Sequence, residues 1–173
     1  MGFATSHAPS LRQLGYEVMV TELDPNAPVA VVAGKGRVPL IPFEIITEHR
    51  KLGPQFAQWC RASFGWTVER RTQGHLTMFY RAYRPDTPLA PQRMDMVDHW
   101  GRVHSLVIRG PGEYALAYAG GEKYVPRHIE LANTEPEYLT PINSGALDIA
   151  IDWFCIIGCQ YGLKRLLNPR QKN

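Results

Sequence analysis

Cysteine is scarce in this sequence, and its scarcity excludes one class of fold at once. Three cysteines among 173 residues cannot hold together a disulfide-rich scaffold. Glycine and proline are plentiful by comparison, with 15 and 14 residues, which excludes a plain helical bundle or a long coiled coil and favours short elements joined by turns. Because 45% of the residues are apolar and 20% are charged, the chain can bury a hydrophobic core, and its length fits one domain of ordinary size.

Lysine is the second scarce residue. Five lysines accompany fourteen arginines, and the stretch 61–109 holds eight arginines and no lysine. Arginine forms bidentate pairs with carboxylates and stacks on aromatic rings, so it suits protein interfaces. A GC-rich genome also enriches arginine, and the sequence leaves both explanations open. The arginines that we predict for an interface are Arg70, Arg71, Arg81 and Arg84.

Charge and targeting signals are weak. The net charge of +3 is too small to argue for a nucleic-acid partner. The N-terminus lacks a charged segment followed by an apolar one, so we do not expect secretion. Residues 1–15 are small, polar and proline-containing without periodicity, and they predict an N-terminal arm.

Alternating and β-branched stretches between turn residues predict a small antiparallel sheet within residues 16–143. Hairpins are expected across Thr72-Gln73-Gly74 and Gly110-Pro111-Gly112, because both turns contain glycine. Residues 84–92 carry three prolines and predict an extended Pro/Arg-rich loop. The expected strands are 16–23, 28–33, 66–71, 75–83, 102–109 and 113–119, and the expected short helices are 43–51 and 54–64.

Residues 145–167 form the most informative element that the sequence predicts. Ser144 can cap the N-terminus of a helix and Asn168-Pro169 can stop it, which gives a helix of about 34 Å. From 149 to 163 the segment is apolar on nearly every side, as expected for a helix in the domain core, one buried by a partner subunit, or one in a membrane. The candidates for facing a partner or lipid are Trp153, Phe154, Ile156, Ile157 and Tyr161.

One carboxylate interrupts this apolar segment. Asp152 lies among Ile149, Ile151 and Trp153, where an unpaired charge is costly. We therefore expect Asp152 to be buried and paired, with an arginine of this chain or of a neighbouring subunit as its natural partner.

The fold expected from these patterns is α+β: a small antiparallel sheet of hairpins with two short helices and a long apolar C-terminal helix. The chain divides into an N-terminal arm (1–15), an α+β domain (16–143) that contains the Pro/Arg-rich loop, and the C-terminal apolar helix with a basic tail (144–173).

Signals of catalysis are few. Cys155 and Cys159 are four residues apart, but no second pair of cysteine or histidine at short spacing accompanies them, so we predict no metal site and no cofactor. His75-Leu76-Thr77-Met78 resembles half of the His-x-Thr-apolar pattern that 2H phosphoesterases use twice. This resemblance covers four residues and implies that His75 would transfer protons while Thr77 held the phosphate. A second copy of the pattern is lacking, because His104-Ser105-Leu106 and His128-Ile129-Glu130 both lack the hydroxyl at the required position.

The balance of these observations favours a non-catalytic structural or accessory subunit of a large multiprotein assembly. Its expected partners are other protein subunits, with membrane contact through 145–167 as an option and nucleic acid not favoured. A membrane-bound respiratory-type complex is one setting, in the mitochondrial inner membrane if the source is eukaryotic. The alternatives are a virion head or tail component and a 2H-like phosphoesterase that uses His75 and Thr77.

Overall fold

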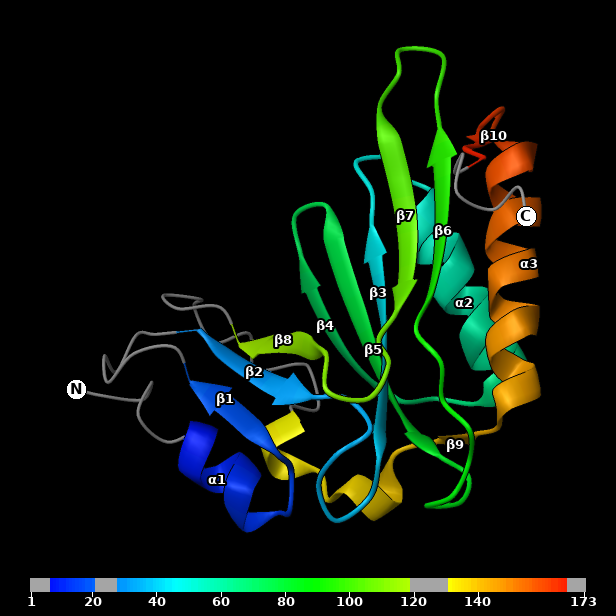
Figure 1. Ribbon diagram of the computed structural model, residues 1–173. Helices are drawn as coiled ribbons and strands as arrows, with labels where there is room; N and C mark the ends of the chain where they lie inside the picture. The colour runs from blue at the N-terminus through cyan, green and yellow to red at the C-terminus, as the bar shows by residue number, and fades with distance from the viewer. Residues whose placement is uncertain (1–6, 21–27, 119–130, 168–173) are drawn as a thin grey trace.

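Two sheets and three α-helices make up the part of the chain that the computed structural model describes, residues 7–20, 28–118 and 131–167 (Figure 1). The mixed helix and strand content confirms the expected α+β class. In chain order the elements are α1 (His7–Gln13), β1 (Val18–Val20), β2 (Val29–Val32), β3 (Leu40–Ile46), α2 (Leu52–Phe64), β4 (Val68–Thr72), β5 (His75–Ala82), β6 (Gln92–Val97), β7 (Val103–Ile108), β8 (Tyr114–Tyr118), the 3₁₀ turns η2 (Leu131–Asn133) and η3 (Pro136–Tyr138), β9 (Pro141–Ile142), α3 (Ser144–Gln160) and β10 (Lys164–Arg165).

The larger sheet has the strand order β10-β6-β7-β3-β5-β4, and the short strand β9 pairs with β5 in parallel. The helices α2 and α3 lie side by side over one face of it (Figure 1). Strand β3 lies at the centre, and its alternation places Ile41, Phe43 and Ile45 in the core under the helices. Glu44 therefore lies on the opposite face.

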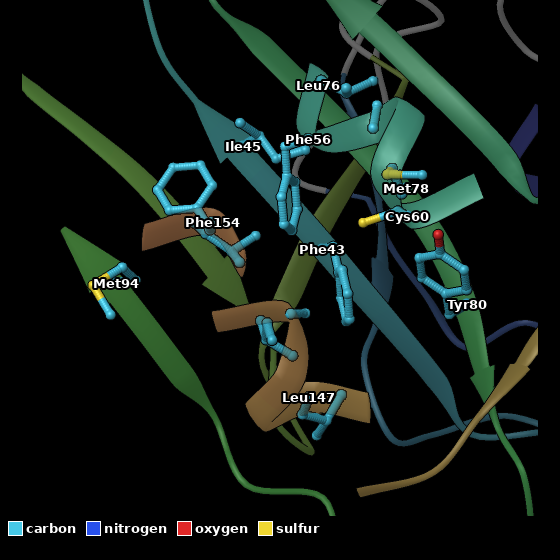
Figure 2. Packing of buried hydrophobic residues seen from close by; sticks show 14 of the residues in the cluster. Phe43, Ile45, Phe56, Cys60, Leu76, Met78, Tyr80, Met94, Leu147 and Phe154 are labelled. Carbon is cyan, nitrogen blue, oxygen red and sulfur yellow. The ribbon is translucent and has the colours of Figure 1, made fainter. Parts of the chain in front are cut away.

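Aliphatic, sulfur-containing and aromatic side chains fill the space between the helices and this sheet (Figure 2). Phe56 of α2 meets Phe154 of α3 edge to face, with ring centroids 5.3 Å apart. Gly158 lets α3 approach β6 closely, since a Cβ atom at that position would clash with the thioether of Met96. The C-terminal helix is thus part of the main core.

The smaller sheet, β1-β2-β8, packs on the opposite face of the larger one. A second hydrophobic core joins the two sheets, in which Val31 of β2 and Leu11 of α1 cluster with Leu40 of β3 and Phe79 of β5. Leu40 and Phe79 lie on this face and pack against the smaller sheet. Farther along, the same face carries the buried polar side chains of Glu44 and Thr77 and the buried apolar side chain of Val107.

The C-terminal helix is shorter than expected. α3 ends at Gln160 rather than at residue 167, so the long apolar helix is wrong. Asn143, not Ser144, caps it, because the Asn143 side chain accepts a hydrogen bond from the backbone N–H of Ala146 at 2.9 Å. Gly162, with φ +77°, then turns the chain so that β10 can pair with β6. None of the helices within the described ranges is long and apolar enough to cross a bilayer.

Two other local expectations are wrong. Residues 43–46 of the expected helix 43–51 belong to β3, which is covered on both faces and so shows an apolar run instead of alternation. The hairpin across Gly110-Pro111-Gly112 is not formed, because β7 pairs with β6 and β3 while β8 pairs with β2. That turn instead carries the chain from the larger sheet to the smaller one.

Strands β6, β9 and β10 have no counterpart among the expected strands, whereas several other elements agree with the sequence patterns. The β4–β5 hairpin is confirmed, and α2 covers the helix expected at 54–64. The N-terminal arm is partly helical, because α1 buries Leu11 completely in the second core. Residues 1–6 of the arm and 168–173 of the basic tail lie outside the described residues.

Candidate functional site

A row of polar side chains crosses the larger sheet on the face opposite α2 and α3. The strand register places Arg70 of β4 opposite Thr77 of β5, and Thr77 opposite Glu44 of β3. Directly opposed side chains on neighbouring strands have Cβ atoms about 4.5–5.5 Å apart, so these three groups are neighbours. His75 lies two residues before Thr77 on β5 and therefore on the same face. We call this group the polar row.

Glu44 is the centre of the polar row. Its carboxylate is 3% exposed, accepts a hydrogen bond from Arg109 Nε at 2.5 Å, and lies 3.4 Å from His75 Nε2. Burial alone would raise the pKa of Glu44, but the interactions with His75 and Arg109 outweigh it and lower that pKa. Glu44 is therefore a charged group in the protein interior, held by two basic side chains.

The hydroxyl of Thr77 is the unusual member of the row. Thr77 is fully buried, and its Oγ1 atom has no hydrogen-bond partner among the residues that the structure describes. A buried hydroxyl without a partner carries a desolvation cost of about 1–3 kcal/mol. The hydrogen-bonding capacity of the Thr77 hydroxyl is therefore unused in the described part of the structure.

A second polar network lies on the same face, farther along the sheet. Ser105 Oγ of β7 donates to Asp95 Oδ1 of β6 at 2.6 Å, and Arg93 Nε donates to the same carboxylate at 2.9 Å. The serine hydroxyl is thus bound to a carboxylate that an arginine already neutralises. Among the described residues, no imidazole that could activate a serine nucleophile is hydrogen-bonded to Ser105.

A hydroxyl, an imidazole and a carboxylate do follow one another on the helix side of the larger sheet. Thr47 Oγ1 is 2.8 Å from His104 Nδ1, and His104 Nε2 is 3.6 Å from Asp98 Oδ2. His104 is only 1% exposed, so a substrate cannot reach it. We interpret this trio as a structural contact that holds the end of β7 against the loop after β3.

The placement of His75 and His104 bears on the phosphoesterase pattern. His75 and Thr77 lie together on the polar row, as their alternation on a strand requires. His104 lies on the face of the sheet that the helices cover, where it is the cross-strand partner of Met96. His128 lies outside the described residues. The structure therefore does not bring His104 to the site of His75.

The outer side of α3 carries large apolar side chains. Ile149, Trp153 and Ile156 are 48%, 39% and 44% exposed, and we call these three residues the α3 ridge. Trp153 stacks on Trp59 of α2, with ring centroids 5.4 Å apart. The indole of Trp153 is thus held in place while its outer side remains open.

Only part of the expected helix face is available to a partner. Phe154 and Ile157 are buried against the larger sheet, so the expectation that they face a partner or lipid is wrong. Tyr161 is half-buried and donates its hydroxyl to Gln55 of α2. Asp152 is exposed beside the ridge, so the expected buried charge is also wrong.

The four candidate interface arginines have different environments. Arg71 pairs with Glu69 at 3.0 Å, and Arg81 donates to the carbonyl oxygen of Leu139 at 3.0 Å. Arg84 is exposed and lies over the ring of its neighbour Tyr83, 5.7 Å from the ring centroid, whereas Arg70 belongs to the polar row. A common role for them at an interface stays a prediction.

Comparison with known proteins gives this chain no relative. No family model matches it, and no curated protein and no solved structure matches it significantly. Functional interpretation therefore depends on the geometry of the chain itself.

Proposed function

We propose that this protein is a non-catalytic structural subunit of a larger protein assembly, and that the α3 ridge is its contact surface for a helix of a partner subunit. The observation that carries this proposal is the exposure of Ile149, Trp153 and Ile156 on one side of α3. Contiguous exposed apolar side chains on a folded domain mark interaction surfaces.

The spacing of the ridge favours a helical partner. Its three residues follow the i, i+4, i+7 pattern, which forms one continuous stripe along a helix. Such a stripe packs best against the stripe of another helix. Trp153 is also held by Trp59, so binding costs little side-chain entropy, and tryptophan is enriched among residues that dominate binding energy.

The charges beside the ridge define the partner further. Asp148 and Asp152 are both exposed on α3. Complementary charge improves association and excludes wrong partners. We therefore expect a partner helix with an apolar stripe flanked by lysine or arginine.

Synthetic helices provide the test. Fluorescence anisotropy would compare an amphipathic helix built from leucine and lysine with one built from leucine and glutamate. We expect the lysine helix to bind more tightly, and Ile149→Ser/Ile156→Ser to weaken this binding at least about tenfold. The matched control is Val103→Ser/Tyr138→Ser, which removes two exposed apolar side chains outside α3.

Charge reversal completes the test. Asp148→Lys/Asp152→Lys is expected to move the preference from the lysine helix to the glutamate helix. Equal binding of both helices, or binding that the ridge variant leaves unchanged, would contradict the proposal.

The setting of the assembly is also a proposal. We propose a membrane-bound respiratory-type complex or a virion head or tail as that setting. A phosphoesterase is the second candidate function, and the observation that favours it is the placement of His75 and Thr77 beside the ionised Glu44.

A further inference from the structure

An open groove runs between α3 and the β6–β10 edge of the larger sheet. Three sulfur-containing residues line it: Met94 of β6, which is 4% exposed, and Cys155 and Cys159 of α3. Cys159 is exposed and Cys155 half-buried, so both thiols are accessible, whereas Cys60 is buried in the core. The complete lining is Met94, Asp152, Cys155, Ile156, Cys159, Gln160 and Arg165.

The two thiols lie next to each other. Cys155 and Cys159 occupy positions i and i+4 of α3 and line the same groove. Residues at this helical spacing have Cβ atoms about 5–6 Å apart. A disulfide needs about 3.5–4.5 Å, so direct oxidation to a disulfide would distort the helix. A single atom that binds both sulfurs fits this spacing better.

The sulfur-containing residues of the groove indicate which metal ion it would bind. Among the described residues, no group of three or more His, Cys, Asp and Glu side chains is arranged to hold a metal, and the third sulfur-containing residue of this groove is Met94. Thiolate and thioether sulfur are soft ligands that favour Cu(I), whereas carbonyl and carboxylate oxygens favour Mg²⁺ and Ca²⁺. We propose that Cys155, Cys159 and Met94 bind one Cu(I) ion in a three-sulfur site.

The charge and proton balance of this site is simple. Both cysteines bind as thiolates, so metal binding releases two thiol protons and changes no oxidation state. Two thiolates and one Cu(I) carry a net charge of −1, and the guanidinium of Arg165 lines the same groove. A nearby arginine stabilises such an anionic complex.

Competition for copper under anaerobic, reducing conditions tests the site. The full chain would be titrated with Cu(I) held by bathocuproine disulfonate, whose copper complex is read by its absorbance. We expect the protein to withdraw one equivalent, and Cys155→Ser or Cys159→Ser to lower the affinity by at least about a hundredfold, which corresponds to about 2.7 kcal/mol. Met94→Leu is expected to lower it by about tenfold.

Cys60→Ala is the matched control, because it removes the one cysteine outside the groove and is expected to leave copper affinity unchanged. X-ray absorption of the loaded protein is expected to show sulfur neighbours only. Copper that stays with the chelator, or copper retained by Cys155→Ser/Cys159→Ser, would overturn the proposal. A preference for Zn²⁺ with an oxygen neighbour would assign the site to zinc and Asp152 and would equally overturn it.

Discussion

At the scale of single residues, two buried threonines near the start of β4 and on β5 form a matched pair. The hydroxyl of Thr77 has no hydrogen-bond partner among the described residues, whereas that of Thr67 donates to the carbonyl oxygen of Phe79. Both side chains are almost completely buried. Substitutions at Thr77 measure the cost of burying a hydroxyl without a hydrogen bond. Substitutions at Thr67 measure the cost of burying a hydroxyl together with the benefit of its hydrogen bond.

Valine has the shape of threonine without its hydroxyl, so opposite effects are expected at the two positions. Thr77→Val should raise the free energy of unfolding by about 1 kcal/mol, and Thr67→Val should lower it by about 1 kcal/mol. Urea denaturation measures both. A loss of stability in Thr77→Val similar to that in Thr67→Val would show that the Thr77 hydroxyl has a partner in solution.

The same face allows the phosphoesterase candidate to be tested directly. Because His75 holds the buried Glu44 carboxylate, we interpret it as a structural residue. A panel of cyclic and linear phosphodiesters is expected to show no turnover by the wild-type protein. Turnover that disappears in His75→Ala/Thr77→Ala would replace the structural function with a catalytic one.

The ion pair of Glu44 shows how far sequence alone can predict the polar row. A single acid in the apolar run Leu40–Ile46 is a signal, because a buried charge needs a partner. The partner is Arg109, 65 residues away along the chain. Eight arginines in 61–109 were equally available by sequence, and only the strand register distinguishes them.

At the scale of elements, the β6–β7 turn depends on one carboxylate. Asp98 accepts hydrogen bonds from the backbone N–H groups of Trp100 and Arg102 and from Arg102 Nε. Burial opposes ionisation, but these hydrogen bonds outweigh it and lower the pKa of Asp98 from 3.8 to about 2.

The stability that Asp98 contributes depends on pH in a defined direction. Because the folded-state pKa is the lower one, the contribution is complete above pH 3.8 and is lost as the pH falls toward 2. The difference in urea midpoint between wild type and Asp98→Asn is therefore expected to be constant above about pH 5 and to shrink below pH 4. A difference that stayed constant down to pH 2 would show that Asp98 is not the titrating group.

The C-terminal helix shows why one element was predicted only in part. Its sequence is apolar on most sides because one side packs on the sheet, another meets Trp59, and the ridge remains exposed. Hydropathy does not distinguish an exposed apolar side chain from a buried one. Gly162 was the stop signal in the sequence, since only a residue that tolerates positive φ fits the turn after α3.

At the scale of the whole molecule, the exposed ridge has a consequence for solution behaviour. The isolated chain is expected to associate in a concentration-dependent, polydisperse way, because the apolar side chains of the ridge are exposed to water. Light scattering of the wild type and of Ile149→Ser/Ile156→Ser would measure this, with a smaller apparent mass expected for the variant. A monodisperse wild-type particle of 19.6 kDa would count against the assembly proposal, and a stable dimer would assign the ridge to a second copy of the chain.

The sequence predicted strand pairing only where the two strands are neighbours along the chain. The β4–β5 hairpin connects strands that are neighbours in sequence, and a glycine turn identified it. Strand β3 pairs instead with β5 and β7, which follow much later in the chain. Pairings of that kind depend on which faces are buried together, and a single sequence does not specify them.

Arg109 is the last residue before the turn that leads from the larger sheet to the smaller one, and its guanidinium is tied to Glu44 at the centre of the larger sheet. The smaller sheet is tied to the larger one by the backbone N–H of Gly34, which follows β2 and donates to the carbonyl oxygen of Leu40 of β3 at 2.8 Å. Separation would also expose the second hydrophobic core. We therefore expect the two sheets to lose their amide-proton protection as one cooperative unit in hydrogen exchange, although they share no backbone ladder.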